Sequence, residues 1–584
     1  MEKKSIVFQD CLKTYTTDQD KAITPEITLD YFYKKIKELD LRILSEAKRI
    51  DNGRLDIPVY FSVCGEDALS MTGTKKQMGK GASPVQAEAS ACMELAERFS
   101  FFSFKNNPDN FLSGDYQTMV EAGYPVLEME YLLASVHDTN TDVNLLQELL
   151  EEIPMQWTWA TNISQEKDIL IPFSWFYAIN EFNGPSAGNT YEESALQGIC
   201  EIIERHVCSR VNNEKIETPK IDKDSVKDEI AKALLKKFTQ NNIELYLNDF
   251  SLDTGICTVG ALAIDRTTFP EKSEIVYTAG TTPDPEKALI RAITEVAQLA
   301  GDFNTGSNYV ASGLPKPLSM DEVDYLTGSR TDVSIAQMSS LAHNNMKIEI
   351  DNCINSLKRI NMDIFMIDVT HEGLNIPALY TIIPGAHFRE RSRIKDVGLF
   401  AAKLLLELVT DPNLLEKKLK AMERLLPQRY YLEFYRGRNF VNMGLLEDAV
   451  DHFDKALSLR PEAEDLPYIY SFKGSCLKDL DRIDEAIDVL KQGLGEDEER
   501  PDLHNSLGVC YYKKQNYADA ITHFKRAVDL NPSSAIDYAN LGVNYSRIGS
   551  NDLAVEFLTL ALTLDPSLDF ANDLLQQIMA KDLK

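Results

Sequence analysis

The sequence predicts two kinds of structure in one chain: a large α+β domain, followed by an all-α solenoid of short repeats. Strand-like runs rich in β-branched residues alternate with helical patterns over residues 1–395. Residues 429–584 instead repeat one helical pattern, with a period of about 34 residues. Between them, residues 396–428 form a predicted helical connector that Asp411-Pro412 interrupts. We therefore expect domains at 1–395 and 429–584, joined by this connector.

Composition limits the protein classes that fit this chain. The 584 residues are 44% apolar, which is enough for sizeable cores. A net charge of −30 argues against nucleic acid or an anionic membrane as a direct partner. The nine cysteines are scattered without a C-x-x-C pair, as is typical of reduced core residues in the cytoplasm. The N-terminus lacks the apolar core of a signal peptide, and no apolar run reaches the ~18 residues of a membrane span. We therefore expect a cytoplasmic protein.

The strands of the predicted α+β domain are spread along its whole length. The strand-like runs are residues 59–63, 169–173, 256–264, 364–369 and 378–383. Helical patterns lie between them, so we expect strands and helices to alternate along a mixed α+β domain.

Three predicted helices carry carboxylates on a face that should be apolar. At about 100° per residue, the polar residues of each helix share one side, among small apolar residues. These polar residues are Ser90, Glu94 and Glu97; Glu193, Gln197, Glu201 and Glu204; and Arg291, Glu295 and Gln298. Carboxylates beside apolar surface repel one another unless cations compensate them, and Mg²⁺ takes carboxylate oxygens and bridges phosphates. The alternative is a solvated helix face with local ion pairs, which three such segments together disfavour.

A short glycine-containing segment precedes the first acidic helix. In residues 79–84, Ser83 suits a helix cap and Pro84 suits the first helical position. The glycines could allow the backbone to approach a phosphate, although the spacing of a Walker loop is missing. A simple loop is the alternative. Residues 186–190 precede the second acidic helix in the same way.

These segments together resemble the ATP-binding motifs of the YcaO family. The matching stretches are GKGASPVQAEASACMELAER, SAGNTYEESALQGICEIIER and ALIRAITEVAQ, with residues 21–29 and 382–385 as further elements. They occur in the family's order over about residues 1–395. The resemblance implies Mg-ATP-dependent activation of a peptide or protein backbone amide, as in thioamidation or cyclodehydration to an azoline. The second stretch is most similar to the type that serves as an accessory factor for β-methylthiolation of a ribosomal protein. An ATP-binding accessory or scaffold factor without chemistry of its own is therefore the alternative.

The same resemblance implies ATP and Mg²⁺ as cofactors and assigns residues to them. The implied metal ligands are Glu94, Glu97, Glu193, Glu201, Glu204 and Glu295. The implied nucleotide-binding residues are Lys21, Thr28, Ser90, Asn189, Arg205, Arg291 and Gln298. Arg205, Arg291 and Glu295 are the implied catalytic residues. This inventory suits phosphoryl transfer, which depends on positioning and on cations that stabilise phosphate charge.

Regularly spaced glycines mark the repeats. Gly437, Gly474, Gly508 and Gly542 lie 37, 34 and 34 residues apart, and each is followed twelve residues later by alanine. Small residues at these points let two antiparallel helices approach closely. The pattern resembles the tetratricopeptide repeat, with an unrelated helical bundle as the alternative. A final helix, from Ala571 to about Leu583, is the expected cap.

The repeats should recruit other proteins. Stacked helix pairs form a concave face from their first helices, and we expect Asn505, Asn540 and Asn544 to contact a partner there. Candidate partners are the peptide or protein substrate, a sulfur donor or modification enzyme, and a ribosomal protein. The last fits because a basic partner suits an acidic chain. We also expect the protein to form a homodimer.

Overall fold

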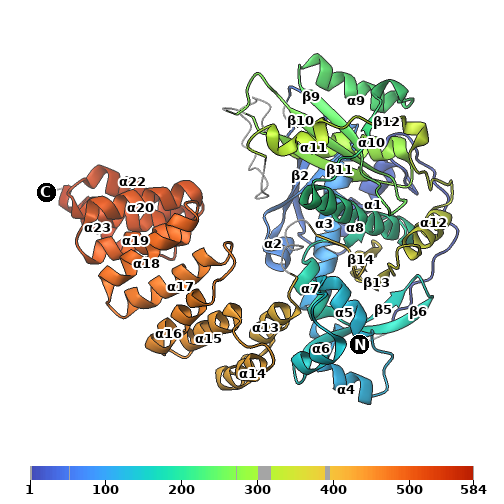
Figure 1. Ribbon diagram of the computed structural model, residues 1–584. Coiled ribbons are helices and arrows are strands. Elements are labelled where there is room, and N and C mark those ends of the chain that lie inside the picture. Colours follow the sequence, from blue (N-terminus) through green and yellow to red (C-terminus); the bar gives the residue numbers. More distant parts are fainter. Residues whose placement is uncertain (1–2, 52, 271–272, 300–316, 389–394, 583–584) are drawn as a thin grey trace. The chain divides into compact units, whose positions relative to one another are not determined.

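The computed structural model divides the chain into two compact units (Figure 1). It describes residues 3–51, 53–270, 273–299, 317–388 and 395–582. Contacts within the chain separate Met1–Val397 from Gly398–Lys584. The first unit mixes helices and strands, whereas the described part of the second is built from helices. This arrangement confirms the predicted fold class.

The strands of the first unit form three sheets in the part of the chain that the structure describes. One sheet has the order β1 (Leu44–Arg49), β2 (Val59–Cys64), β3 (Lys76–Lys80). A second has the order β11 (Val276–Thr281), β10 (Thr258–Ile264), β9 (Glu244–Asp249), β8 (Lys220–Ile221), β12 (Asp332–Val333). A third has the order β4 (Leu112–Gly114), β5 (Met155–Asn162), β13 (Phe365–Asp368), β14 (Ala378–Ile382), β7 (Pro185–Ala187), with β6 (Lys167–Pro172) also paired to β5. Each of the five predicted strand-like runs overlaps a strand, namely β2, β6, β10, β13 and β14.

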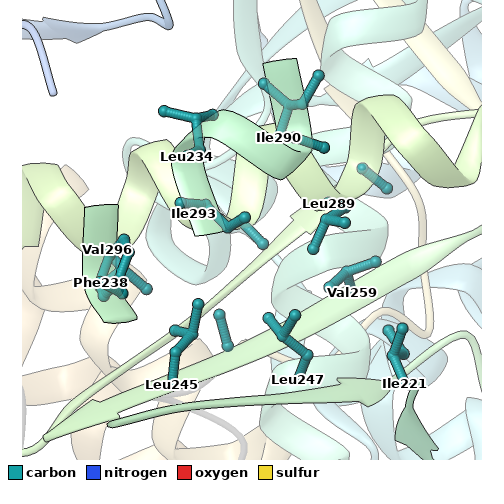
Figure 2. Close-up of a cluster of buried hydrophobic side chains, with 14 of the residues drawn as sticks. Ile221, Leu234, Phe238, Leu245, Leu247, Val259, Leu289, Ile290, Ile293 and Val296 are labelled. Carbon is teal, nitrogen blue, oxygen red and sulfur yellow. The ribbon is translucent and has the colours of Figure 1, made fainter. Parts of the chain in front are cut away.

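Helices cover these sheets. They are α1 (Pro25–Glu38), α2 (Glu66–Thr72), α3 (Pro84–Asn106), α4 (Tyr116–Glu121), α5 (Met129–Val136), α6 (Val143–Leu150), α7 (Phe173–Asn180), α8 (Tyr191–Glu214), α9 (Glu229–Gln240), α10 (Pro285–Leu299), α11 (Asp324–Thr327) and α12 (Met346–Lys358). All seven residues of β10 are buried, which requires cover on both faces of that strand. Both α8 and α10 contact β10 and β11. Figure 2 shows the core between this sheet and helices α9 and α10, where Leu234 and Ile293 lie above Leu245 and Leu247.

Glycines allow two of the acidic helices to lie directly on their preceding strands. A Cβ at Gly79 in β3 would come 2.0 Å from the Ala91 nitrogen of α3. A Cβ at Gly280 in β11 would come 2.4 Å from the Ala292 nitrogen of α10. The loop expected at residues 79–84 is therefore only partly a loop, because Gly79 and Lys80 end strand β3. Gly79 serves close packing between strand and helix.

The second unit begins with the two helices of the predicted connector, α13 (Val397–Leu408) and α14 (Pro412–Leu425). Asp411 caps α14 by accepting a hydrogen bond from the Leu414 N–H, and Pro412 occupies the first turn, as the interruption at these two residues predicted. The repeat helices follow as α15 (Tyr430–Asn442), α16 (Leu446–Ser458), α17 (Leu466–Asp479), α18 (Ile483–Glu496), α19 (Pro501–Lys513), α20 (Tyr517–Leu530), α21 (Ala535–Arg547), α22 (Asn551–Leu564) and α23 (Asp569–Asp582). Leu583, the expected last residue of the capping helix, lies outside the described residues. None of the described helices combines the length and apolar character that a membrane crossing requires.

The repeat glycines lie against large apolar side chains of the following helix. A Cβ at each glycine would come within 3 Å of that neighbour: Phe453 at Gly437 (2.6 Å), Leu490 at Gly474 (2.5 Å), Phe524 at Gly508 (2.7 Å) and Leu558 at Gly542 (2.6 Å). Each neighbour lies four residues after the alanine that the pattern identified. The structure therefore confirms that these small residues let paired helices approach closely.

The three asparagines expected to contact a partner differ in accessibility. Asn544 is only 1% exposed, and its amide donates to the Asn540 carbonyl oxygen at 2.8 Å. It therefore packs inside the repeats and does not lie open on the concave face. The sequence pattern could not show this, because the burial of Asn544 comes from tertiary packing. Asn505 is half-buried and donates to Asp537. Asn540 is half-buried as well. These two stay candidates for partner contact.

Candidate functional site

Capped helix starts hold the acidic residues in place. Ser83 caps α3 by accepting a hydrogen bond from the Gln86 N–H, with Pro84 in the first turn, as predicted. Thr190 caps α8 by accepting from the Glu193 N–H. Each cap fixes where its helix begins and thereby which side chains share a face.

The polar faces of α3, α8 and α10 meet at a cavity of about 440 Å³. All thirteen residues assigned to ATP, metal or catalysis from the sequence line it. They are Lys21, Thr28, Ser90, Glu94, Glu97, Asn189, Glu193, Glu201, Glu204, Arg205, Arg291, Glu295 and Gln298. The three helices therefore share one cavity, which the solvated-face alternative did not expect, although Glu94 and Glu97 do form local ion pairs with Arg98 on α3.

Sequence reasoning missed part of the cavity's charge. Besides the six carboxylates, six basic side chains line it, and Lys76, Lys80 and Arg98 were not among the assigned residues. Lys76 and Lys80 lie on β3, whose period of two places them on one face together with Met78. That alternation could have identified them if residues 76–80 had been assigned to a strand. The protein's own cations thus offset the carboxylate repulsion that the sequence had suggested.

Ion pairs join α8 to α10 and β3 to α10 at the cavity, while Glu94 and Glu97 pair with Arg98 of their own helix α3. Arg291 Nε of α10 lies 3.3 Å from Glu204 Oε2 of α8, and Arg291 Nη1 donates to Gln197 Oε1 at 3.0 Å. Lys80 of β3 pairs with Glu295 of α10. Glu204 also accepts the Thr281 N–H at 3.1 Å. Each pair joins a carboxylate, which could bind a metal, to a cation, which could bind a phosphate oxygen.

Glu193 holds the N-terminal segment against α8. Its carboxylate lies 3.3 Å from Lys21 Nζ and accepts the Ala22 N–H at 2.9 Å and the Asn189 amide at 3.0 Å. Thr28 Oγ1 donates to Asn189 Oδ1 at 3.0 Å. The N-terminal segment thereby brings two of the assigned residues, Lys21 and Thr28, into a cavity otherwise built by residues 76–298.

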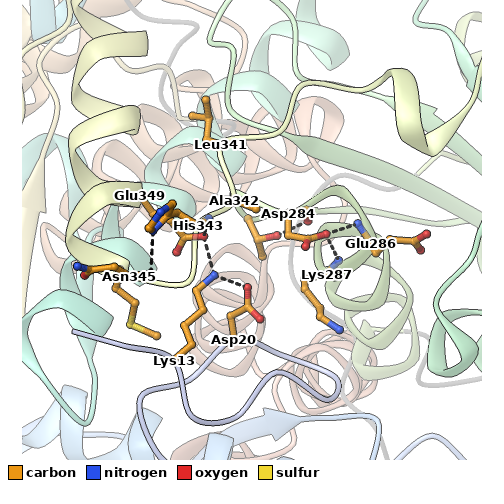
Figure 3. Close-up of polar contacts among 12 residues, drawn as sticks. Lys13, Asp20, Asp284, Glu286, Lys287, Leu341, Ala342, His343, Asn345 and Glu349 are labelled. Atoms are coloured by element: carbon orange, nitrogen blue, oxygen red, sulfur yellow. Dashed lines mark hydrogen bonds and ion pairs between the residues drawn. The ribbon is translucent and has the colours of Figure 1, made fainter. Parts of the chain in front are cut away.

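A buried ion pair anchors this N-terminal segment a few residues earlier (Figure 3). Lys13 Nζ lies 2.6 Å from Glu349 Oε1 of α12 and 2.6 Å from Asp20 Oδ2. The side chains of Lys13 and Glu349 are 4% and 1% exposed, so water screens their attraction little. Burial raises the pKa of Glu349 to about 7 even with Lys13 beside it. Without Lys13 this pKa would rise further, and Glu349 would take up a proton at neutral pH.

We expect Lys13→Met to loosen the N-terminal segment. Removing one partner of a buried pair typically costs about 3–5 kcal/mol, because the other charge is left uncompensated. The free energy of unfolding, from urea titration, should fall by that order, and nucleotide affinity should fall because Lys21 is no longer held in place. The double variant Lys13→Met, Glu349→Leu is the control. Removing both charges should recover most of the stability, and a double variant as unstable as the single one would contradict the role of the pair.

Burial shapes the protonation of the cavity. It raises the pKa of Glu97 well above its usual range, and the neighbouring Glu94 carboxylate adds to that shift. Burial also raises the pKa of Glu201, against the opposing effect of Arg205 and Arg98. Burial, together with Arg291, lowers the pKa of Lys80 to about 7. Such perturbed groups in one cavity are typical of functional sites.

The residues present fit a magnesium–nucleotide ligand. Carboxylate oxygens are the ligands that Mg²⁺ prefers, and arginine and lysine bind phosphate oxygens. Gln298 Oε1 is buried at the cavity without a hydrogen-bond partner among the described residues, so it can accept from a ligand. No three acidic, histidine or cysteine side chains of the described chain converge into a ready metal cage. The ion pairs explain this, because the carboxylates contact basic side chains.

Comparison with known proteins identifies the class. The family model described as YcaO cyclodehydratase, ATP- and Mg²⁺-binding, matches residues 78–387, which is more than half of the chain. The chain belongs to the YcaO family, and ATP and Mg²⁺ are its cofactors. Tetratricopeptide-repeat models match residues 501–534 and 538–568. The second unit therefore contains tetratricopeptide repeats, a class of helical repeat with binding surfaces for other proteins.

Individual relatives support this assignment. An uncharacterised protein of Methanothermobacter thermautotrophicus is 25% identical over 394 residues, covering 62% of this chain and 94% of the relative. The ribosomal protein S12 methylthiotransferase accessory factor YcaO of Escherichia coli is 26% identical over 310 residues, covering 50% of each chain. A solved heterocyclase in complex with substrate and cofactor aligns with a TM-score of 0.53 at 18% identity, over 66% of this chain and 55% of the heterocyclase. This last likeness shows the fold.

We expect the stabilisation by Mg-ATP to shrink as the pH falls from about 7.5 to about 5.5. The folded pKa values of Glu97 and Glu201 lie above the ordinary value of 4.5, so the empty site opposes folding increasingly as the pH rises above 4.5. Protons relieve this repulsion in mild acid, which leaves less for the metal ions to relieve. Lys80, with its lowered pKa of about 7, costs stability increasingly as the pH falls from 10.5 toward 7 and stays nearly constant below.

Melting temperatures with and without Mg-ATP at several pH values measure this margin. Ligand at a hundred times its Kd should add about 2.7 kcal/mol at the upper pH. The stacked histidines His137 and His387 lie outside the cavity lining. Their contribution to stability is therefore the same with and without Mg-ATP, and it cancels in the difference between the two melting temperatures. An equal margin at every pH would contradict the expectation.

Proposed function

We propose that the protein uses Mg-ATP to activate a backbone amide of a peptide or protein by phosphorylation, as in thioamidation or cyclodehydration. The observation that carries this proposal is the cavity in which six carboxylates face six basic side chains, which come from three helices, strand β3 and the N-terminal segment. Such a site can hold two Mg²⁺ ions on carboxylates and a triphosphate on arginine and lysine. Residues 1–395 would carry this chemistry.

The side chains divide into roles that follow from their chemistry. Glu94, Glu97, Glu193, Glu201, Glu204 and Glu295 would hold the metal ions. Arg205 and Arg291 would stabilise phosphate charge, and Glu295 would fix the metal nearest to them. Lys21, Thr28, Ser90, Asn189 and Gln298 would orient the nucleotide. Bound Mg-ATP would supply the phosphoryl group that makes the amide oxygen a leaving group.

Partner exchange within the site would accompany nucleotide binding. Arg291 and Lys80 pair with Glu204 and Glu295 in the structure. A metal ion that takes the carboxylates would release both cations toward the phosphates. The buried Lys80, with its lowered pKa, would regain its charge beside a phosphate.

A second candidate function is that of an ATP-binding accessory factor for β-methylthiolation of a ribosomal protein. The name of the Escherichia coli relative favours it. In this case residues 429–584 would recruit a modification enzyme or the ribosomal protein, and the ATP site would control that contact. If the protein is instead the amide-activating enzyme, the same repeats would recruit the substrate or a sulfur donor.

Mass spectrometry of candidate substrates distinguishes these functions. Intact proteins and peptides from cells with and without this protein are compared. Loss of one water per site would indicate an azoline, and replacement of oxygen by sulfur would indicate a thioamide. Loss of a methylthio group from a ribosomal protein alone would indicate the accessory role. Unchanged masses throughout would contradict both functions.

A further inference from the structure

A second cavity lies at the C-terminal half of α3 and outside the nucleotide site. Its volume is about 340 Å³. Ser100 and Ser103 of α3 and Asn107 just after that helix line it, together with residues of β5 and β13 from the third sheet. It shares no lining residue with the nucleotide cavity, although α3 contributes to both. The proposed chemistry assigns no role to it.

The cavity lies at a gap in the third sheet. β4 pairs with Met155–Trp157 of β5, and β13 pairs with Thr161 and Asn162. On this edge of β5, residues 158–160 have no partner strand among the described residues, while their opposite edge pairs with β6. On the other side of the gap, Ile367 and Asp368 of β13 pair only with β14. Thr158, Trp159, Ile367 and Asp368 line the cavity, so two open strand edges face it.

Two buried hydroxyl groups also lack partners. Ser100 Oγ and Ser103 Oγ have no hydrogen-bond partner among the described residues, and Ser100 is 0% exposed. A serine within a helix usually bonds the carbonyl oxygen four residues earlier when nothing else is available. Buried polar groups are nearly always hydrogen-bonded to protein or water, so these two hydroxyls beside the cavity could bond a polar group that settles against α3.

The rest of the lining carries both signs of charge, from Lys4, Asp368 and Glu372, and so suits a ligand without a large net charge of its own. Asp368 already accepts hydrogen bonds from Tyr191 Oη at 3.1 Å and from the Thr370 N–H at 2.9 Å. His371 Nδ1 accepts the Leu374 N–H at 3.2 Å, and burial lowers the pKa of His371, so its ring is neutral. The open strand edges offer alternating donors and acceptors. An extended peptide main chain has the matching pattern.

We propose that this cavity binds an extended segment of the peptide substrate through the main chain of that segment. This proposal rests on the proposed function, in which the protein acts on peptides. Ser100 lies six residues after Glu94 on α3, which is about 9 Å along the helix axis and about 120° round it. About four extended residues cover such a path round the helix. A segment held in the sheet gap would thus present an amide a few residues away to the nucleotide site. Recognition through main-chain groups would tolerate varied substrate side chains.

Fluorescence of Trp159 tests the proposal in the full-length protein without ATP. The probe is a capped pentapeptide of alternating threonine and valine, compared with the same peptide N-methylated at alternate residues, which cannot donate those main-chain hydrogen bonds. We expect a saturable change for the first peptide and at least tenfold weaker binding for the second. Trp159→Phe should remove the signal, because Trp157 and Trp175 are fully buried. Equal binding of both peptides, or binding of maltose instead, would overturn the proposal.

Variants of the serines locate the site. Ser103→Leu fills the cavity and should weaken peptide binding at least tenfold. The milder double variant Ser100→Ala, Ser103→Ala should have the same effect, and it replaces the leucine variant if leucine disturbs folding. Ser70→Leu on exposed α2 is the matched control and should bind normally. Normal peptide binding or unchanged substrate KM in the serine variants would overturn this inference and leave the proposed function standing. Peptide binding without any ATP-dependent modification would instead count against the proposed function alone.

Discussion

Replacing Glu201 and Glu204 by glutamine should abolish Mg-ATP binding. The substitution removes two of the six carboxylates in the cavity but keeps the size and shape of both side chains. Mg²⁺ binds carboxylate oxygens far better than amide oxygens, and Arg291 would lose its partner at Glu204. Even changes to groups behind metal ligands cost 10–100-fold in affinity, so we expect a loss of about a hundredfold or more here.

Calorimetric titration with Mg-ATP measures this loss. The control is Glu214→Gln, at the exposed end of the same helix, whose carboxylate pairs only with Arg210 at the surface among the described residues. The control should bind normally. Because the double variant also leaves Arg291 without its carboxylate partner, its melting temperature without nucleotide is recorded to show that it still folds. Unchanged affinity in the double variant would refute the proposed site.

Removing the second unit should abolish partner or substrate capture and leave ATP binding largely intact. A chain ending at Val397 keeps the first compact unit and every residue assigned to ATP and metal, all of which lie before residue 300. A cut at residue 428 is a poorer design, because α14 packs on α15 and Arg436 pairs with Glu416 across them at 2.8 Å. That cut would expose an apolar helix face.

Two assays on the shortened chain separate the functions of the units. Calorimetry should give an Mg-ATP affinity within a few fold of the full chain. Co-purification of partners and modification of substrate should both be lost, since the binding surface of the tetratricopeptide repeats is gone. Modification of substrate at the normal rate by the shortened chain would show that the repeats do not recruit it.

The sequence could predict the parts of the site that depend on local periodicity. Glu94 and Glu97 share a helix face whatever surrounds them, and the strand–helix order made a common site plausible. Lys80 was missed because its role depends on β3 lying beside α10, which no local pattern shows. Asn544 was placed wrongly because its burial comes from neighbouring helices. The gap between β5 and β13 was beyond prediction, since it depends on where pairing between distant strands stops.

The Lys13–Glu349 pair also constrains the order in which the chain can fold during its synthesis. The two residues are 336 positions apart, so this buried anchor of the N-terminal segment cannot form until α12 has been made. At about 5–20 residues per second, translation imposes a wait of about 20–70 seconds on that segment. Lys21 and Thr28 can reach Glu193 and Asn189 before then, but the segment that carries them gains its buried anchor only after α12 has been made.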